Sequence, residues 1–248
     1  FETCRLVNGV APLWEYHARR LVDGLQRLNI ACDITTVESC IERSLALYTS
    51  AQLGYKVLKV IVTRGVGGRG YGFTQDLNPT IICSLSEMPV LAAETVALPL
   101  LQTRLACSAV LAGLKHLNRL ENVLLKAECQ SLGVDDGLAA SEMGWIIETT
   151  HSNVFFKFSD GWKTPRLNMS GVAGVMRQLV LDELSTSVGV AIQKADISVA
   201  ELAGVEAAFC SNSLRGLIAI ESIDQRSLPI DDQFQQLQQS LNQSRFNS

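Results

Sequence analysis

The stretch LKHLNRLENVL, residues 114–124, joins an uncharged segment of small residues to a helical pattern. The uncharged segment covers residues 109–114, and the helical pattern covers residues 120–132. Lys115, at the junction, can be held in a partly desolvated pocket, where loss of water lowers the pKa of an amine and makes it nucleophilic. A lone lysine before a helix is more often a surface residue. This stretch alone therefore does not distinguish a nucleophilic lysine in a pocket from a surface lysine.

The composition is typical of a compact globular protein. The 248 residues are 47% hydrophobic and 19% charged, with only 6 Pro. The net charge is −4 and the 21 Lys and Arg are scattered, which argues against nucleic acid and acidic membranes as partners. The longest uncharged stretch near the middle, between Arg104 and Lys115, is too short to span a bilayer, so a soluble protein is expected.

The cysteines and histidines form no metal-binding pattern. Seven cysteines, an odd number, include no CxxC pair, and we expect free thiols in a reducing compartment, the cytoplasm. His17, His116 and His151 form no HExxH motif and no cluster at ligand spacing, so no metal site is expected. The GxSxG motif that would support a serine hydrolase is also absent from the sequence.

The first part of the chain predicts a small α+β domain over residues 1–86. Strand patterns cover residues 1–7, 57–63 and 80–85, and helical patterns cover residues 14–28 and 35–53. The best candidate for a linker is the segment 87–93. A larger, strand-rich domain is predicted for residues 94–248.

The larger domain mixes short strands with helices. Strand-like runs lie near Val96, Leu138, Trp145, Val154, Val190, Ala207 and Leu217. Helical patterns cover residues 120–132 and 172–184, and a Gln-rich helix is expected over residues 231–241. The predicted fold class is therefore α+β.

The loop between the strands at 57–63 and 80–85 matches the GxGxxG pattern of dinucleotide-binding proteins at residues 65–70. That pattern acts at the N-terminus of a helix, whereas this loop continues to Pro79 and another strand. The remaining interpretations are a flexible hairpin loop and a substrate loop in which Arg64 or Arg69 binds a carboxylate.

Five segments of the sequence together resemble one family of enzymes. KHLNRLE, residues 115–121, resembles the segment that carries the cofactor lysine of the aminodeoxychorismate lyases, which are fold-type IV pyridoxal-phosphate enzymes. The other segments are HARRL at 17–21, RGVGGRGY at 64–71, Glu148 with SN at 152–153, and GVAGVMR at 171–177. They come in the family's order and cover most of the chain. The resemblance implies the fold-type IV architecture, of which a strand expected before Phe1 is missing from this sequence.

By this resemblance, Lys115 holds pyridoxal 5'-phosphate as a Schiff base and moves protons during the reaction. Glu148 would pair with the pyridine nitrogen and keep it protonated, which makes the ring an electron sink. Arg20 would bind the cofactor phosphate, and Arg19, one residue out of register, is its rival. Without the resemblance, Glu148 would be interpreted as a solvent-facing strand residue and both arginines as helix-surface charges.

The resemblance also implies contacts from a helix start and from loops. The backbone amides of Val175 and Met176 would bind phosphate, because helix N-termini offer amides and a positive dipole. Asn212 falls in a further turn on the phosphate side. The residues expected to contact the substrate are Arg69, Tyr71 and His116.

The lyase chemistry implied by the resemblance acts on 4-amino-4-deoxychorismate. Loss of the proton at the amine-bearing carbon and departure of the enolpyruvyl group give 4-aminobenzoate and pyruvate, a step of folate biosynthesis. The alternatives are an aminotransferase of the same fold, acting on D- or branched-chain amino acids, and a scaffold without cofactor. Leu120 stands where branched-chain aminotransferases have a tyrosine, which favours the lyase. The family's sites form near a dimer interface, so a homodimer is expected.

Overall fold

The structure is a computed structural model of the chain and describes residues 1–48, 54–74, 77–89 and 94–246. It divides into two compact units. The first comprises residues 1–90 with 115–117, and the second comprises residues 91–114 with 118–248. The predicted linker, residues 87–93, begins at the last residue of a strand, and its residues 90–93 lie outside the described residues.

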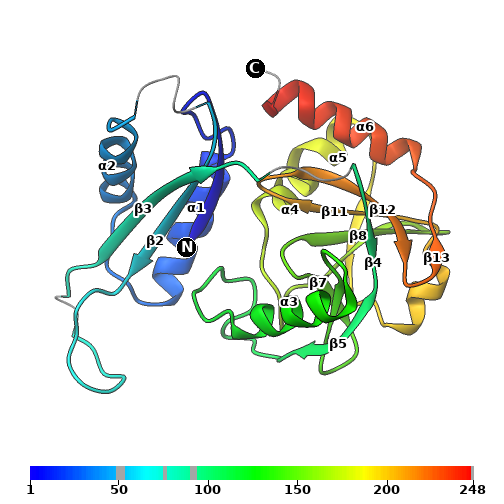
Figure 1. Cartoon of the computed structure of the whole chain (residues 1–248), viewed down its shortest axis with the longest axis horizontal. Helices are drawn as coiled ribbons and strands as arrows, with labels where there is room; N and C mark the ends of the chain where they lie inside the picture. Colours follow the sequence, from blue (N-terminus) through cyan, green and yellow to red (C-terminus); the bar gives the residue numbers. More distant parts are fainter. Residues whose placement is uncertain (49–53, 75–76, 90–93, 247–248) are drawn as a thin grey trace. The chain divides into compact units, whose positions relative to one another are not determined.

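The first unit is a three-stranded antiparallel sheet with two helices (Figure 1). Its elements are β1 (Glu2–Val7), α1 (Trp14–Arg27), α2 (Ile34–Leu45), β2 (Tyr55–Thr63) and β3 (Thr80–Glu87). Buried residues alternate along the strands, as Cys4 and Leu6 do in β1, whereas Leu21 and Leu25 are four apart on one face of α1. These residues pack in one hydrophobic core, so the two periodicities explain both the elements and their packing.

The second helix is shorter than the sequence predicts. The helical pattern covers residues 35–53, but α2 ends at Leu45. Val37 is fully buried in the core, whereas Leu47, just beyond the end of the helix, is 82% exposed, so a helix extended to Leu47 would not bury this side chain. The end of the predicted helix, residues 49–53, lies outside the described residues.

The second unit contains two sheets. One has the strand order β10-β9-β8-β11-β12-β13 with β4 paired to β12, and the other has the order β5-β6-β7. The strands are β4 (Thr95–Leu98), β5 (Leu100–Leu105), β6 (Leu138–Ser141), β7 (Ile146–Thr149), β8 (Asn153–Phe158), β9 (Gly161–Pro165), β10 (Ile192–Ala195), β11 (Ala207–Asn212), β12 (Gly216–Ile223) and β13 (Arg226–Ser227). The helices are α3 (Leu120–Leu132), α4 (Val175–Leu179), the π-helical η2 (Val180–Leu184), α5 (Ser185–Ser187), the 3-10 helix η3 (Ala200–Gly204), α6 (Asp232–Leu241) and the π-helical η4 (Asn242–Phe246).

Aromatic side chains pack at the centre of the larger sheet. Phe155 of β8 stacks on Phe209 of β11 with ring centroids 4.4 Å apart, and Trp162 meets Phe209 edge-on at 5.1 Å. Phe234 of α6 packs against the same ring at 5.3 Å. Asp231 caps α6 by accepting hydrogen bonds from two backbone amides of its first turn, which explains where this helix begins.

Helix α3 covers β5, a strand that the sequence patterns did not predict. The buried face of α3 carries Leu125 and Cys129. The Glu128 carboxylate accepts hydrogen bonds from the backbone amides of Gln102 at 2.6 Å and Thr103 at 2.9 Å, where the pairing of β5 with β6 is irregular. A side chain from another part of the sequence thus stabilises β5, and local alternation cannot reveal such a contact.

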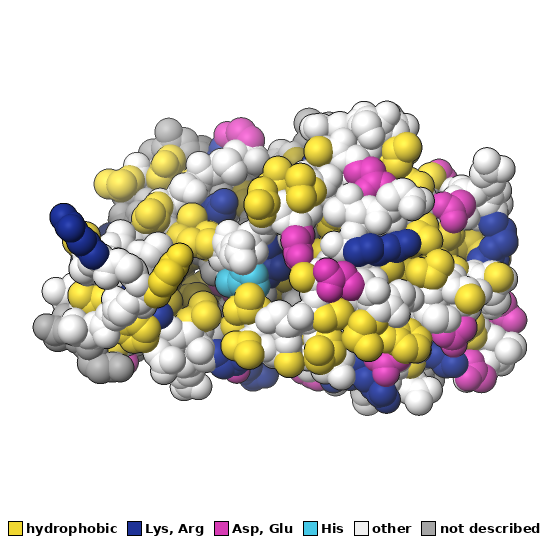
Figure 2. Space-filling view, turned by 90° about the horizontal axis from the view of Figure 1, so that it is seen from below, with side chains coloured by type: hydrophobic (Ala, Val, Ile, Leu, Met, Phe, Trp, Pro, Cys, Tyr) yellow, Lys and Arg dark blue, Asp and Glu magenta, His cyan; other side chains and the backbone are white. Residues whose placement is uncertain are grey.

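The surface carries charges of both signs. On the face drawn in Figure 2, Lys and Arg side chains stand apart from one another with acidic side chains among them. Within the described residues, no three His, Cys, Asp or Glu side chains come together in a way that could hold a metal ion. None of the helices in those residues has the length and apolarity needed to cross a membrane. All seven cysteines are free thiols.

Candidate active site

Lys115 lies against Phe1, next to the start of β1. Its backbone carbonyl accepts a hydrogen bond from the backbone nitrogen of Phe1 at 2.9 Å, and its Nζ lies 4.6 Å from the centre of the Phe1 ring. Residues 115–117 therefore belong to the first unit, although the chain on either side belongs to the second. Lys115 and His116 are both half-buried, so the Lys115 amine is partly shielded from water.

A buried cluster of charged side chains lies in the same unit. Glu2 on β1 and His17 on α1 are each 1% exposed. The Glu2 carboxylate is bonded to His17 Nδ1 at 2.6 Å, to Arg20 Nε at 3.0 Å and to Arg20 Nη2 at 2.5 Å. Because Arg20 meets the carboxylate with two nitrogens, the plane of its guanidinium is fixed.

These contacts set the charge state of the cluster. Burial alone would raise the pKa of Glu2, but the charge of Arg20 and the hydrogen bonds from His17 and Arg20 outweigh burial and lower this pKa to about 2. Burial is the main cause that lowers the pKa of His17, and the charges of Arg20 and Lys115 act in the same direction. At neutral pH the cluster is therefore an ion pair of Glu2 and Arg20, with a neutral His17 as a further donor.

The two candidate arginines of α1 lie in different surroundings. Arg19 is exposed and pairs with Glu15 on the helix surface, whereas the Arg20 side chain is only 11% exposed and points to Glu2. Glu2 belongs to none of the sequence motifs described above. Its place in β1, in phase with the buried Cys4, is the signal that could have found it, since a charged residue in a core position needs a partner.

The glycine-rich loop joins the antiparallel strands β2 and β3 as a hairpin loop, so the next element in the described part of the chain is a strand and not a helix. At its base, Arg64 donates hydrogen bonds to the backbone carbonyls of Leu28 at 2.6 Å and Asn29 at 2.5 Å. The Arg64 guanidinium also lies 3.6 Å from the centre of the Phe73 ring. Arg64 thus anchors the loop to the end of α1, which leaves Arg69 as the better candidate for a carboxylate.

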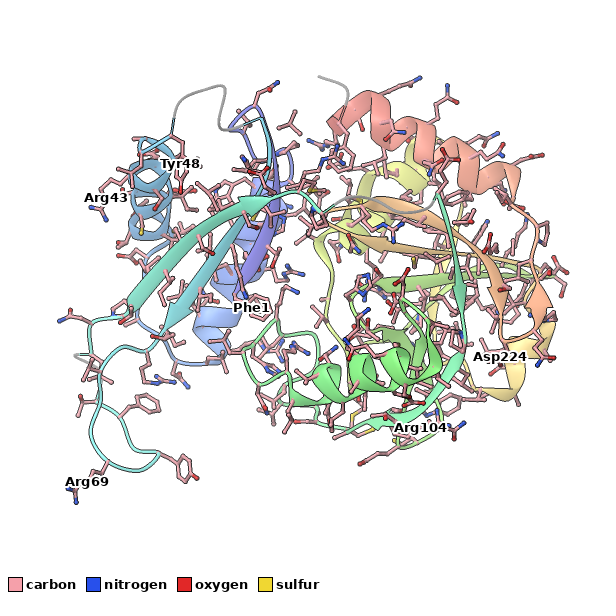
Figure 3. The ribbon with its side chains drawn as sticks, viewed as in Figure 1. Phe1, Arg43, Tyr48, Arg69, Arg104 and Asp224 are labelled. Atoms are coloured by element: carbon pink, nitrogen blue, oxygen red, sulfur yellow. The ribbon has the colours of Figure 1, made fainter. Side chains whose placement is uncertain are left out.

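The tip of this loop carries two of the residues expected to contact the substrate. Arg69 projects outward and Tyr71 is fully exposed (Figure 3). Near the base, Gly65 has a φ of 91°, and a Cβ there would lie 1.9 Å from the carbonyl oxygen of Asn78. Only glycine fits this position, so the loop has a constrained base and an exposed tip.

In the second unit, two side chains hold both backbone polar groups of Val172. Glu148, near the end of β7, accepts a hydrogen bond from the Val172 N–H at 2.9 Å. Asn153, at the start of β8, donates to the Val172 carbonyl oxygen at 2.9 Å. Glu148 and Asn153 are each 5% exposed, so Glu148 is not a solvent-facing strand residue. We call Glu148, Asn153 and Val172 the Val172 clamp.

Glycines on either side of Val172 make room for the clamp. Gly171 has a φ of 84°, and a Cβ there would lie 3.3 Å from Glu148 Oε2 and 2.5 Å from a methyl carbon of Ile147. A Cβ at Gly174 would lie 2.0 Å from Asn153 Oδ1. The GxxG pattern is therefore required by the close approach of these side chains to the backbone.

Helix α4 follows the second glycine directly. The side chains of Val175 and Met176, at its first positions, are 3% and 0% exposed, so only their backbone amides can face a ligand. Arg177 is buried and donates to Thr164 Oγ1 at 3.1 Å and to the Pro165 carbonyl at 2.9 Å. Burial lowers the pKa of Arg177 to about 10. The arginine of the GVAGVMR segment thus anchors the helix start to β9.

Asn212 organises the turn between β11 and β12. Its Oδ1 accepts hydrogen bonds from the backbone amides of Leu214 at 3.0 Å and Arg215 at 2.8 Å, and its Nδ2 donates to Ser152 Oγ at 2.9 Å. Ser152 directly precedes Asn153 of the Val172 clamp. Asn212 is therefore connected to the clamp through its hydrogen bond to Ser152 and the peptide bond that joins Ser152 to Asn153.

The predicted site residues fall into two groups. The first unit contains Lys115, His116, Arg20, Arg69 and Tyr71, and the second contains Glu148, Val175, Met176 and Asn212. A half-buried lysine, a buried glutamate and a glycine-framed helix start lie on a fold that defines a class of protein, the fold-type IV pyridoxal-phosphate enzymes. This chain belongs to the family described as Amino-transferase class IV, because the model of that family matches residues 1–223. The predicted fold class and the family resemblance are both confirmed.

Several known proteins are similar to this chain over most of its length. The aminodeoxychorismate lyase of Vibrio harveyi is 33% identical over 251 residues, which cover 98% of this chain and 90% of that protein. A putative branched-chain-amino-acid aminotransferase of Methanocaldococcus jannaschii is 28% identical, covering 91% of this chain and 78% of that protein. Among solved structures, the 4-amino-4-deoxychorismate lyase from Pseudomonas aeruginosa has a TM-score of 0.88 and 37% identity, covering 98% of this chain and 89% of that one.

Proposed function

We propose that this protein is a pyridoxal-phosphate-dependent lyase that converts 4-amino-4-deoxychorismate into 4-aminobenzoate and pyruvate, a step of folate biosynthesis. The observation that carries the proposal is the similarity, over 98% of the chain, to two proteins named as this lyase, at 33% and 37% identity. An aminotransferase relative is 28% identical over 91% of the chain. Amino transfer is therefore the second candidate.

The side chains present fit pyridoxal phosphate. The amine of Lys115 can hold its aldehyde, and the buried carboxylate of Glu148 suits a positively charged ring nitrogen. The guanidinium of Arg20 and the amides at the start of α4 suit a phosphate. A Cβ at Gly174 would lie 2.0 Å from Asn153 Oδ1, so the residue directly before that helix has to be a glycine. When bound, the cofactor supplies an electron sink for the bond that breaks in the substrate.

Lys115 carries the proton transfer in this proposal. Its Nζ would hold the cofactor aldehyde, and the same amine, once released, would remove the proton from the amine-bearing carbon of the substrate. Because this base is released beside that carbon, proximity supplies much of the rate. The Phe1 ring, 4.6 Å from Nζ, limits the access of water to the amine.

Glu148 and Arg20 are each held by neighbouring groups in a way that suits the role proposed for them. The Val172 N–H fixes the Glu148 carboxylate. The fixed carboxylate would keep the ring nitrogen of a bound cofactor protonated. The Glu2 carboxylate fixes the Arg20 guanidinium, so less conformational freedom is lost when a phosphate binds. Asn212 accepts hydrogen bonds from two backbone amides and so fixes the shape of the turn between β11 and β12, which is proposed to lie near the phosphate.

We further propose that the protein is a homodimer and that Arg69, with Tyr71, binds the substrate. Leu120, Val123 and Leu124 are 66%, 62% and 53% exposed, and their spacing places them on one face of α3, where a second copy can cover them. Arg69 is exposed on the loop tip and can make two bonds to a substrate carboxylate. The free thiols support a cytoplasmic location. Sedimentation of the native chain and of Leu124→Glu, which should be shifted toward monomer, tests the homodimer.

The proposed activity is tested by mixing the protein with pyridoxal phosphate and 4-amino-4-deoxychorismate. Release of 4-aminobenzoate and pyruvate without a 2-oxo acid supports the lyase, whereas amino exchange with a 2-oxo acid and no 4-aminobenzoate contradicts it. Lys115→Ala should abolish turnover. The matched control is Lys126→Ala on α3, which removes only a bond to the Asp135 carbonyl. Borohydride reduction and peptide mapping should label Lys115 and not Lys126 or Lys157.

A further inference from the structure

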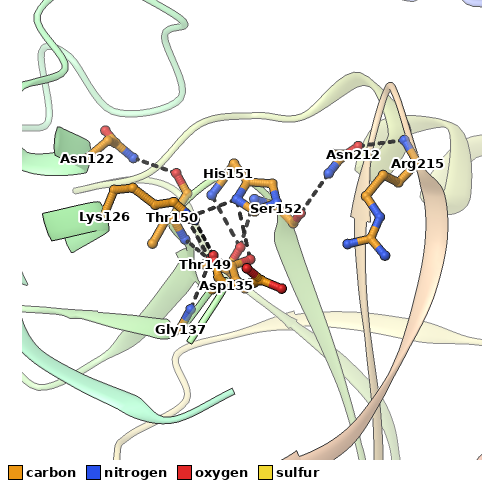
Figure 4. A network of polar contacts seen from close by, with 11 residues as sticks. Asn122, Lys126, Asp135, Gly137, Thr149, Thr150, His151, Ser152, Asn212 and Arg215 are labelled. Atoms are coloured by element: carbon orange, nitrogen blue, oxygen red, sulfur yellow. Dashed lines mark hydrogen bonds and ion pairs between the residues drawn. The ribbon is translucent and has the colours of Figure 1, made fainter. Parts of the chain in front are cut away.

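The turn between the two side chains of the Val172 clamp is held by a buried network (Figure 4). Residues 149–152 connect Glu148 to Asn153. Within the turn, the Thr149 N–H donates to the Ser152 carbonyl at 2.8 Å, and Thr149 Oγ1 accepts from the Ser152 N–H at 2.9 Å. The separation and direction of the two clamp side chains therefore depend on the shape of this turn.

Asp136, in the segment between α3 and β6, fixes the turn from outside. It is 5% exposed, and its Oδ1 accepts hydrogen bonds from the Thr150 N–H at 2.9 Å, from Thr150 Oγ1 at 2.7 Å and from the Gly137 N–H at 2.9 Å. The Thr150 carbonyl in turn accepts a bond from Asn122 Nδ2 of α3 at 3.2 Å. Thr150 is thus held through its amide, its hydroxyl and its carbonyl.

His151 completes the network at the surface. Its Nδ1 lies 2.9 Å from Thr150 Oγ1 and 3.5 Å from Asp136 Oδ2. Because Thr150 donates its single hydroxyl proton to Asp136, His151 Nδ1 is the donor in its bond to Thr150. The His151 side chain is 48% exposed, so it lies between the Asp136 carboxylate and solvent.

We propose that Asp136 is a positioning residue for the reaction, acting through Thr150 on the Val172 clamp. The inference rests on the proposed function, in which Glu148 meets the ring nitrogen. Removing the acceptor at Asp136 Oδ1 leaves buried donors without their partner, and the turn relieves that cost by opening to water. Glu148 and Asn153 lie directly at the two ends of this turn, so opening it loosens both bonds to Val172.

Three variants separate the hydrogen-bond acceptor from the charge. Asp136→Asn keeps a carbonyl oxygen in place of Oδ1 and removes the charge, and Asp136→Ala removes both. Thr150→Val removes the two hydroxyl bonds, to Asp136 and to His151, and keeps the bond from the Thr150 N–H to Asp136. Asp231→Ala is the matched control. Asp231 is a hydrogen-bonded aspartate of the same unit that caps α6 and pairs with Lys157, so its loss destabilises the unit away from the turn.

Hydrogen exchange of the Val172 amide, measured on the full chain with and without pyridoxal phosphate, is the direct readout. Asp136→Ala should speed this exchange about tenfold or more, with a smaller increase in Thr150→Val. Asp136→Asn and the Asp231→Ala control should leave it within about twofold. If Asp136→Ala does not fold, Thr150→Val carries the test. Unchanged Val172 exchange in the folded variants, or equal damage from Asp136→Asn and Asp136→Ala, overturns the proposal.

Turnover measured in the native chain and in the Glu148→Gln variant distinguishes an effect on the position of Glu148 from a general loss of stability. Asp136→Ala should lower kcat about tenfold with little change in KM. In the Glu148→Gln background the same substitution should have little further effect, because the contact that it orients is already impaired. An equal loss in both backgrounds indicates a merely structural role and overturns the proposal. Native protein that releases no 4-aminobenzoate would contradict the proposed function instead, and Val172 exchange would still test the role of Asp136 in holding the clamp.

Discussion

Glu2 in the first unit and Glu148 in the second are both buried carboxylates, but different kinds of partner hold them. Glu2 is bonded to the side chains of His17 and Arg20, whereas Glu148 is bonded to the backbone N–H of Val172. Side-chain partners carry charge and titrate, and a backbone amide does neither. The charged partners make the Glu2 cluster sensitive to charge and pH, and the glycines beside Val172 make the Val172 clamp sensitive to any change in the space around the backbone.

The largest effect is expected from removing the buried carboxylate of the first unit. Glu2→Ala takes the carboxylate away from the buried Arg20 charge and should lower the free energy of unfolding by about 3–5 kcal/mol. Glu15→Ala, which removes the partner of the exposed Arg19, should cost less than about 1 kcal/mol. Urea unfolding of both variants measures the difference. Equal losses would show that burial does not distinguish the two ion pairs.

Acid should weaken the same cluster. The pKa of Glu2 is lowered from 4.5 to about 2, so its contribution is fully present above pH 4.5 and is lost as the pH falls toward 2. This contribution is on the order of 3 kcal/mol. The pKa of His17 is also lowered, so its contribution decreases in the same direction as the pH falls through the usual value of 6.5. Urea midpoints measured against pH should fall less steeply in Glu2→Gln than in the Glu15→Gln control, and parallel curves would contradict this assignment.

Titrations with pyridoxal phosphate and with substrate should distinguish the roles of Arg20 and Arg69. Arg20→Ala should weaken the retention of pyridoxal phosphate, whereas Arg69→Ala should keep the cofactor and raise the KM for substrate. Loss of a charge-assisted hydrogen bond costs about 1.5–3 kcal/mol, roughly tenfold or more in the affected constant. Arg19→Ala should change neither. The opposite result, with cofactor lost from Arg69→Ala and kept by Arg20→Ala, would exchange the phosphate and substrate sides of the site.

The smallest of these effects tests the space around the Val172 clamp. Gly174→Ala adds a Cβ that would lie 2.0 Å from Asn153 Oδ1. The Asn153 side chain must then move, which should lower the free energy of unfolding by about 1–3 kcal/mol. Gly204→Ala is the control, because a Cβ there only reaches Phe158 at 3.9 Å, and its cost should stay within about 1 kcal/mol. Thermal unfolding compares the two variants. If Gly174→Ala is as stable as the control, the clamp is not tightly packed.

Local patterns were sufficient for elements that carry their own start and stop signals. α3 has the predicted bounds because Leu125 and Cys129 mark its buried face and Gly133, with a φ of 70°, ends it. The predicted extension of α2 was wrong at residues 46–48, because spacing alone cannot show whether a surface exists for the helix to cover. β5 was not predicted because the Glu128 carboxylate, from another part of the sequence, stabilises part of its backbone by accepting hydrogen bonds.

Motifs located the candidate site, but not the residues that hold it in shape. Glu2 is 18 residues from Arg20, and Asp136 is 14 residues from Thr150. No periodicity connects such pairs, because strand pairing and helix packing bring them together. Arg64 shows the opposite case. Its motif suggests a contact to a ligand, but its guanidinium binds backbone carbonyls at the end of α1. The roles of the individual site residues toward the cofactor stay predictions.

The contact between α3 and β5 also bears on how the protein behaves at high concentration. A strand at the border of a sheet can recruit a strand from another molecule, because its outward amides are available for pairing. Glu128 already engages the amides of Gln102 and Thr103, and its charge opposes the approach of an apolar strand. The helix that follows the candidate cofactor lysine therefore also protects the chain against the intermolecular β-pairing from which fibrils grow.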